Sequence, residues 1–141
     1  NYYINLSHTV TSLNLLSFGD MVKWWIQQQQ QNPSIAQTLP HVQCVNYPAH
    51  LDPKYAPAKL KEKTASMLRE LEQYLTDANL LSVYKPAIDN IHNNVIDAVV
   101  DEDYRQQQWN KMKDFLGSLD RHRNRNIFDY LPYMQEFWDQ P

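Results

Sequence analysis

Glycine is scarce in this sequence, and that scarcity limits both the folds and the sites that the chain can form. Only two of the 141 residues are glycine, Gly19 and Gly117. Neither the G-x-G-x-x-G fingerprint of dinucleotide-binding folds nor the Walker phosphate loop can be written with these two glycines. A low glycine content also favours helices over a turn-rich β fold. The sequence therefore predicts a mostly helical chain without a glycine-rich phosphate loop.

The composition indicates one domain over residues 1–141, because 43% of the residues are hydrophobic and the length suits one core. The formal net charge of -3 argues against nucleic-acid binding by the surface as a whole. The sequence shows neither a signal peptide nor the run of roughly 18 apolar residues that a membrane span needs. We therefore expect a cytoplasmic chain that has no membrane partner.

A single cysteine, Cys44, excludes both an internal disulfide framework and a metal site built from several cysteines. The five histidines include no pair at the i, i+4 spacing of a helical metal site. Two interpretations of Cys44 stay open. It is either a small core residue of a strand or one half of a Cys–His pair with His41 or His50.

The first part of the chain, residues 1–48, has the pattern of a strand, a helix and a second strand. YYINLS (2–7) alternates polar and apolar residues, MVKWWIQQQQQ (21–31) has helical periodicity, and HVQCVNYP (41–48) is again strand-like. Ser17 or Asp20 is the expected N-cap of the helix. This order predicts a βαβ unit with two parallel strands.

The second part, residues 57–141, has helical periodicity throughout. Three amphipathic helices are expected over 58–75, 79–100 and 101–123, the third with acids at its start and bases at its end, as the helix dipole favours. Pro86 should lie in the first turns of the second helix or kink it. The aromatic tail after Pro132 either docks on these helices or forms a stacking platform for bases. The apolar stripes of the second and third of these predicted helices include Val95, Ala98, Val99, Trp109, Met112, Phe115 and Leu116. The predicted fold class is therefore α+β and predominantly helical.

Two parallel strands do not make a stable sheet on their own, and parallel sheets usually continue through further strands. We therefore expect the βαβ unit to be the end of a sheet whose earlier strands lie outside this chain. Unpaired strand edges recruit other strands, so a homodimer through a strand edge or through the helices is the expected partner state.

Five segments together resemble the C-terminal part of radical SAM proteins of the twitch-domain kind, found in phage and marine microbial sequences. The segments are NLSHTVTSLNLLSF, WW, HVQCVNYPAHLDP, LKEK and FLGSLDRHRNRNIFDYLP. The resemblance implies the last βαβ unit of a partial TIM-type barrel, followed by a helical extension. A longer parent protein would then carry an iron–sulfur cluster and S-adenosylmethionine.

The family's cluster is held by three thiolates in a C-x-x-x-C-x-x-C motif, and this chain has one cysteine. We therefore expect no cofactor and no catalysis in this chain itself. The resemblance places a ligand edge at the strands and at the loop after the first of them. Its candidate residues are Asn5, Ser7, Asn14, Val45 and Asn46. The alternative is that these residues only cap strands and turns.

The densest basic cluster of the chain is formed by Arg121, His122, Arg123 and Arg125. One interpretation is a patch for phosphate or an acidic partner, because guanidinium groups bind phosphate well. The other is a helix C-terminus at which cations offset the dipole, neutralised by Asp114, Asp120 and Asp129.

The sequence thus favours a non-catalytic C-terminal fragment of a radical SAM-like protein. The alternative is a self-contained helical module that binds protein or RNA through residues 121–125.

Overall fold

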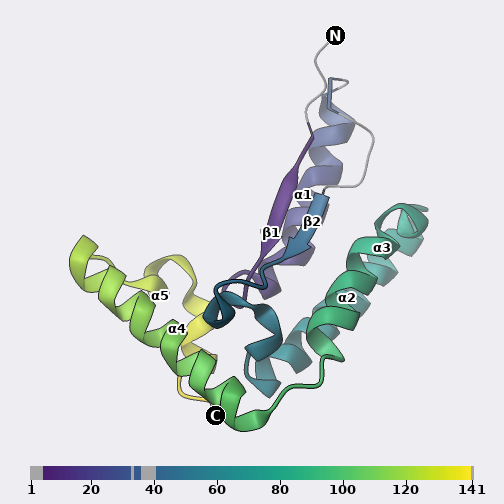
Figure 1. Cartoon of the computed structure of the whole chain (residues 1–141). Helices are drawn as coiled ribbons and strands as arrows, with labels where there is room; N and C mark the ends of the chain where they lie inside the picture. Colours follow the sequence, from purple (N-terminus) through teal and green to yellow (C-terminus); the bar gives the residue numbers. More distant parts are fainter. Residues whose placement is uncertain (1–4, 33, 36–40, 141) are drawn as a thin grey trace.

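The structure is a computed structural model that describes residues 5–32, 34–35 and 41–140. It is mostly helical (71%), with a two-stranded parallel sheet near the N-terminus followed by several helices (Figure 1). This confirms the predicted α+β, predominantly helical class. The strands are β1 (Ser7–Val10) and β2 (His41–Cys44), and the helices are α1 (Phe18–Gln31), α2 (Ala58–Asp77), α3 (Leu81–Ile91), α4 (Glu102–Arg123), α5 (Ile127–Tyr130) and α6 (Gln135–Trp138). Short helical segments join them: η1 (Leu15–Ser17), η2 (Ala49–Leu51), η3 (Pro53–Tyr55), the π-helical η4 (His92–Ile96) and η5 (Pro132–Met134).

The two strands pair in parallel with Ser7 opposite His41 and Val10 opposite Cys44, as the βαβ pattern predicted. The first strand lies later than the predicted 2–7, of which residues 2–4 are outside the described residues. Its register is set by Val10, which is fully buried. Because His8 and Thr9 are both polar, the sequence shows no alternation of polar and apolar residues at this strand. The second strand begins as predicted and ends at Cys44, before the predicted end at Pro48.

One face of the sheet is polar and open. Along both strands exposed residues alternate with more buried ones, the period that a half-buried sheet requires. The exposed positions are Ser7, Thr9, His41 and Gln43. The opposite face packs on helices: the His8 ring lies 6.1 Å from that of Phe18 on α1, and Cys44 contacts Asn90 on α3.

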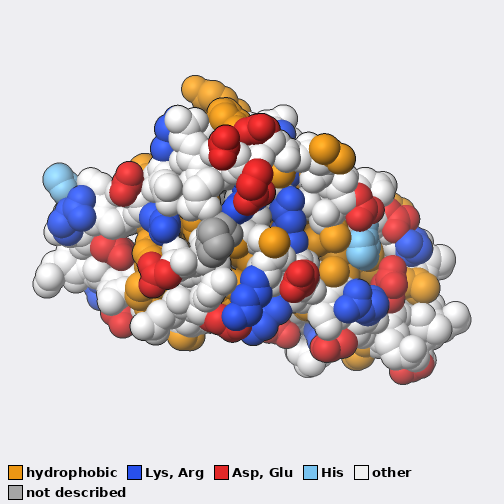
Figure 2. Space-filling model, turned by 90° about the horizontal axis from the view of Figure 1, so that it is seen from below, with side chains coloured by type: hydrophobic (Ala, Val, Ile, Leu, Met, Phe, Trp, Pro, Cys, Tyr) orange, Lys and Arg blue, Asp and Glu red, His pale blue; other side chains and the backbone are white. Residues whose placement is uncertain are grey.

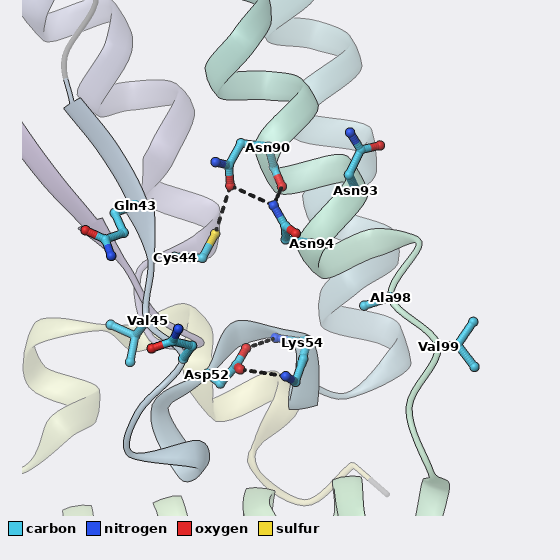
Figure 3. Close-up of a pocket in the computed structure, with 11 residues that line it drawn as sticks. Gln43, Cys44, Val45, Asp52, Lys54, Asn90, Asn93, Asn94, Ala98 and Val99 are labelled. Atoms are coloured by element: carbon cyan, nitrogen blue, oxygen red, sulfur yellow. Dashed lines mark hydrogen bonds and ion pairs between the residues drawn. The ribbon is translucent and has the colours of Figure 1, made fainter.

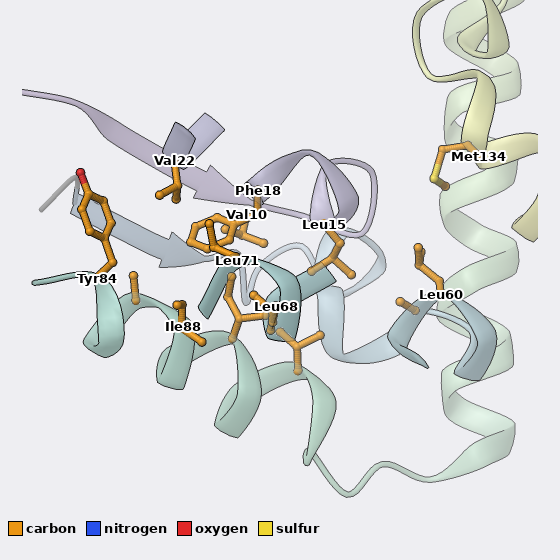
Figure 4. Close-up of a cluster of buried hydrophobic side chains, with 14 of the residues drawn as sticks. Val10, Leu15, Phe18, Val22, Leu60, Leu68, Leu71, Tyr84, Ile88 and Met134 are labelled. Carbon is orange, nitrogen blue, oxygen red and sulfur yellow. The ribbon is translucent and has the colours of Figure 1, made fainter. Parts of the chain in front are cut away.

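A single hydrophobic cluster joins the sheet to the helices (Figure 4). α1 contributes Phe18 and Val22, and α2 contributes Leu68 and Leu71, all at most 1% exposed. Gly19 lets α1 and α2 approach closely, because a Cβ there would lie 2.9 Å from the sulfur of Met67. Burial of each large apolar side chain contributes about 1.5–3 kcal/mol, so this cluster is what holds a two-stranded sheet in place.

The second predicted helix, over 79–100, is shorter than expected. α3 ends at Ile91 and passes into the π-helical η4, which is closed by the N–H of Asp97 donating to the carbonyl of His92 (2.9 Å). Val99, predicted for the apolar stripe, lies beyond this turn and is fully exposed. Pro86 lies inside α3 on its exposed side, without ending the helix.

The third predicted helix is confirmed as α4, with the expected charge distribution. Its N-cap is Asp101, whose carboxylate accepts a hydrogen bond from the N–H of Tyr104 (2.8 Å). Trp109 and Met112 are buried as predicted, whereas Phe115 is 43% exposed. The buried face of α4 runs through Trp109, Met112 and Leu116 at a spacing of three and four residues, and Phe115 lies beside it.

The aromatic tail packs back on the helices. Met134 and Phe137 are fully buried, and the Trp138 ring lies 6.4 Å from that of Trp109 and 5.1 Å from that of Phe128. Tyr133 donates a hydrogen bond to the carbonyl of Leu13, which ties the tail to the segment after β1. These contacts leave Phe137 and Trp138 unsuited to the stacking platform that the sequence had left open.

The predicted N-cap of α1 has a different role. Ser17 occupies the N-cap position but makes no capping hydrogen bond, because η1 runs directly into α1. Its hydroxyl instead lies 3.3 Å from the Tyr133 hydroxyl. Among the described helices, none has both the length and the apolar character that crossing a membrane requires.

An ion-pair network fastens α6 to α2, and it predicts a pH-dependent stability. Glu136 accepts from Lys63 (2.5 Å) and Lys59 (3.1 Å), and these hydrogen bonds lower the pKa of Glu136. A lowered folded-state pKa stabilises the fold above the unfolded pKa of about 4.3, and this contribution disappears as pH falls through the folded-state value. We expect Glu136→Gln to lower the thermal midpoint slightly at pH 7 and to match the wild type near pH 3.

The measurement is thermal unfolding followed by tryptophan fluorescence at both pH values. Glu62→Gln is the matched control, because Glu62 is an exposed glutamate of α2 without an ion pair among the described residues. Equal midpoints for Glu136→Gln and Glu62→Gln at pH 7 would show that the network adds no stability.

Candidate functional site

A polar cavity of about 400 Å³ lies at the carboxyl end of β2 (Figure 3). Its walls come from the end of β2, from the turn at η3, from α3 with η4, and from the segment that follows η4. The residues that line it are Gln43, Cys44, Val45, Asn46, Asp52, Lys54, Asn90, Asn93, Asn94, Ala98 and Val99. Most of these side chains are polar, and amides are the commonest group among them.

Two of the five predicted ligand-edge residues, Val45 and Asn46, line this cavity. Both follow directly after β2, and Val45 extends the pairing because its N–H donates to the carbonyl of Val10 (2.9 Å). Asn5 and Ser7 are exposed at the amino end of β1, the opposite end of the parallel pair. The structure therefore does not bring the five residues together.

Asn14, the remaining candidate, holds the turn after β1. Its Oδ1 accepts from the N–H of Thr11 (2.8 Å), and its Nδ2 donates to the carbonyl of Thr9 (2.9 Å). Both ends of the amide are thus engaged by backbone groups of the preceding residues. This is the capping role that the sequence offered as the alternative to ligand binding.

Asparagines from α3 and η4 form the far wall of the cavity. The thiol of Cys44 donates to Oδ1 of Asn90 (Sγ–O 3.6 Å), and Nδ2 of Asn94 donates to the carbonyl (3.0 Å) and Oδ1 (3.1 Å) of Asn90 (Figure 3). Asn93 and Asn94 lie in the π-helical turn, a widened geometry that often occurs at functional sites. The competition of the Asn94 amide for the carbonyl of Asn90 favours this local widening.

An ion pair forms the lower wall. Asp52 is 4% exposed and is the N-cap of η3, where Oδ1 accepts from the N–H of Lys54 (3.0 Å). Its Oδ2 lies 3.1 Å from the Lys54 ammonium. The hydrogen bond to Asp52 raises the pKa of Lys54, so the lysine is held as a cation. Both charges are therefore paired with each other within the cavity wall.

Cys44 does not form the Cys–His pair that the sequence left open. Burial, reinforced by the carboxylate of Asp52, raises the pKa of its thiol to about 11. The thiol donates a hydrogen bond to the amide of Asn90, whereas the His50 ring lies 5.3 Å from that of Phe115. A nucleophilic cysteine needs a lowered pKa, so this thiol behaves as the small buried residue of the other interpretation.

The basic cluster lies at the end of α4, beside an apolar groove of about 550 Å³ between α4 and α5. The groove is lined by Leu116, Leu119, Asp120, Arg123, Arg125, Ile127 and Tyr130. The backbone N–H groups of Asn124 and Arg125 donate to the carbonyl of Asp120, at the end of the helix. No guanidinium group of this cluster makes a hydrogen bond or an ion pair with any residue that the structure describes.

The aspartates predicted to neutralise the basic cluster do not pair with its arginines in the described part of the chain. Oδ2 of Asp120 accepts from the N–H of Ile127 (2.9 Å), and neither Asp114 nor Asp129 pairs with an arginine within the described part of the chain. Elsewhere, acidic and basic side chains are interspersed over the face seen in Figure 2.

Sequence reasoning missed the three asparagines of the cavity and the apolar half of the groove. The signal for the first was Asn90, Asn93 and Asn94 within one predicted helix, since asparagine is a poor helix former in an interior. The signal for the second was the apolar residues Ile127 and Tyr130 directly after the arginines.

The described residues contain no group of three or more His, Cys, Asp or Glu side chains arranged to hold a metal ion. Comparison of the chain with protein-family models, with curated proteins and with solved structures gave no match. The cavity and the groove are therefore interpreted from their own chemistry.

The raised pKa of Cys44 predicts slow alkylation. With a pKa of about 11, roughly one thiol in ten thousand is ionised at pH 7. We expect iodoacetamide to label Cys44 roughly a hundredfold more slowly in the folded chain than in denaturant at pH 7.

Asp52→Asn should speed this labelling without reaching the denatured rate, because burial is the larger cause and the carboxylate the smaller. Asp103→Asn, an exposed aspartate of α4, is the matched control and should leave the rate unchanged. Labelling in the folded chain as fast as in denaturant would contradict the protonated thiol and reopen a nucleophilic role.

Proposed function

We propose that this chain is the non-catalytic C-terminal region of a radical SAM-like protein, in which it supplies part of a ligand-binding edge. The observation that carries the proposal is the cavity at the carboxyl end of β2, lined by Val45 and Asn46. Barrel folds bind their ligands at the carboxyl ends of their strands. The parallel pairing of β1 and β2 through α1 is the arrangement that the end of such a barrel requires.

The residues of this chain do not fit an iron–sulfur cluster. Such a cluster needs several thiolates, whereas Cys44 is the single cysteine and its thiol is held protonated against Asn90. The proposal therefore assigns the chain no cluster and no radical step. Its contribution would be binding, through the amide side chains and the Asp52–Lys54 pair.

A homodimer through strand edges belongs to the same proposal. The sheet has two strands among the described residues, so each strand has an edge without a described neighbour. Such edges recruit strands from other chains.

The coding DNA upstream of the Asn1 codon provides the direct test. We expect the reading frame to continue upstream through a C-x-x-x-C-x-x-C motif, because the proposal places the cluster ligands in an earlier part of the same protein. A start codon directly before Asn1, or a continuing frame without this motif, would contradict the proposal. The binding module would then be the function to pursue.

A second function is favoured by the unpaired arginines at the end of α4. A helical module that binds protein or RNA through residues 121–125 needs free guanidinium groups, and no carboxylate among the described residues pairs with them. We expect heparin retention at low salt to fall when Arg121, Arg123 and Arg125 are changed to Gln, because each guanidinium is free to bind an anion.

The matched control changes the same amount of charge elsewhere, at Arg69, Lys111 and Lys113, and should be retained almost as long as the wild type. Equal retention of the wild type and the arginine variant would remove the support for this second function.

A further inference from the structure

We propose that the groove between α4 and α5 docks an acidic peptide segment with apolar side chains, supplied by a partner protein. The inference rests on the second function above, the interaction module, and names its partner class. It follows from three features of the groove: its lining, its construction and its charge.

Three of the seven lining residues are aliphatic, and the groove is partly open. Leu116 is 7% exposed at the base, Leu119 and Ile127 are half-buried, and Tyr130 is 60% exposed. A volume of about 550 Å³ accommodates a few apolar side chains of a ligand. Removal of these surfaces from water would provide most of the binding free energy, because apolar burial contributes about 25 cal/mol per Å².

The groove is built by a well-defined turn at the end of α4. Asn124 adopts the left-handed conformation (φ 49°), which asparagine tolerates, and ends the helix. The carboxylate of Asp120 then holds the N–H of Ile127 (2.9 Å), which fixes α5 beside the last turns of α4. The groove is thus present before a ligand binds, so binding requires little ordering of the protein.

The charge of the groove selects an anionic partner. Arg123 and Arg125 line it together with one carboxylate, that of Asp120, whose Oδ2 accepts from the backbone N–H of Ile127 (2.9 Å) and forms no ion pair with an arginine among the described residues. A carboxylate can bind a guanidinium group through two parallel hydrogen bonds. A segment that carries both carboxylates and apolar side chains therefore matches the two arginines and the aliphatic part of the lining.

The same lining favours a peptide over RNA. Proteins bind single-stranded RNA largely by stacking its bases on aromatic rings. Tyr130 is the one aromatic residue that lines the groove. The nearby Phe128 and Trp138 rings are engaged with each other in an edge-on contact at 5.1 Å. A formal net charge of -3 also opposes a long polyanion more than a short acidic segment.

The test is fluorescence anisotropy of the full chain with a fluorescein-labelled amphipathic peptide. The peptide carries leucines at i, i+3, i+4 and i+7 and glutamates at its other positions, a pattern that helical ligands of apolar grooves share. We expect saturable binding that weakens with added salt, and a loss of about fivefold or more in affinity for Arg123→Gln/Arg125→Gln. Tyr130→Ser, at an exposed position, should weaken binding severalfold and leave the fold intact.

Arg69→Gln/Lys111→Gln is the matched control with the same change in charge, and it should bind like the wild type. A second peptide with serines in place of the leucines should bind at least about tenfold more weakly. Equal binding of the two peptides, or unchanged binding by the double arginine variant, would overturn the inference. So would the absence of saturation up to about 1 mM peptide.

A labelled oligouridine in the same assay separates this inference from the function on which it rests. If oligouridine binds in an arginine-dependent way and the acidic peptide does not, the peptide inference is wrong and the interaction module stands. If neither probe binds, both are wrong.

Discussion

The pairing of β1 with β2 is the constraint on which the rest of the structure depends. Two strands of four residues, far apart in the chain, lie parallel, and parallel strands can be joined only by a crossover connection. α1 provides that crossover, and its buried Phe18 and Val22 cover the inner face of the sheet together with residues of α2 and α3. Because so small a sheet is unstable alone, its stability comes from this cover rather than from its own hydrogen bonds. The parallel arrangement also brings both carboxyl ends to one edge, and the cavity lies at that edge next to β2.

The shifted titratable groups of the cavity support the proposed binding role. General acid–base or nucleophilic catalysis needs a group whose pKa is moved toward neutrality. The two titratable groups whose pKa values are shifted here move the other way: the thiol of Cys44 is held protonated and the ammonium of Lys54 is held charged by Asp52. The asparagine amides are neutral donors and acceptors at every physiological pH. Such a wall can orient a polar ligand through hydrogen bonds. Its lining residues offer no unpaired ionised group to balance a charge on that ligand.

The sequence predicted the elements whose positions follow from hydrophobic periodicity. It missed the features that depend on single side chains. The long helices α2 and α4 and the crossover α1 followed from apolar residues at helical spacing, which tertiary packing then buried. The first strand was misplaced because His8 and Thr9 are polar residues in a strand whose buried face rests on Val10. Near the early end of α3, the amide of Asn94 competes for the backbone carbonyl of Asn90. In the candidate site, Val45 and Asn46 could be anticipated from the end of a strand. Their partners Asn90 and Asn94 come from a helix whose position only the packing determines.

The arginines at the two ends of α4 lie in different environments. At the buried end, Arg105 is 4% exposed, and its Nε lies 3.0 and 2.9 Å from the two carboxylate oxygens of Glu102. A buried cation without a partner would cost several kcal/mol, so this pairing is a condition of burying the residue. At and just beyond the opposite end of the helix, Arg123 and Arg125 are exposed and form no ion pair with a carboxylate among the described residues. The groove beside these arginines can therefore gain apolar burial from a ligand without first breaking an ion pair of its own.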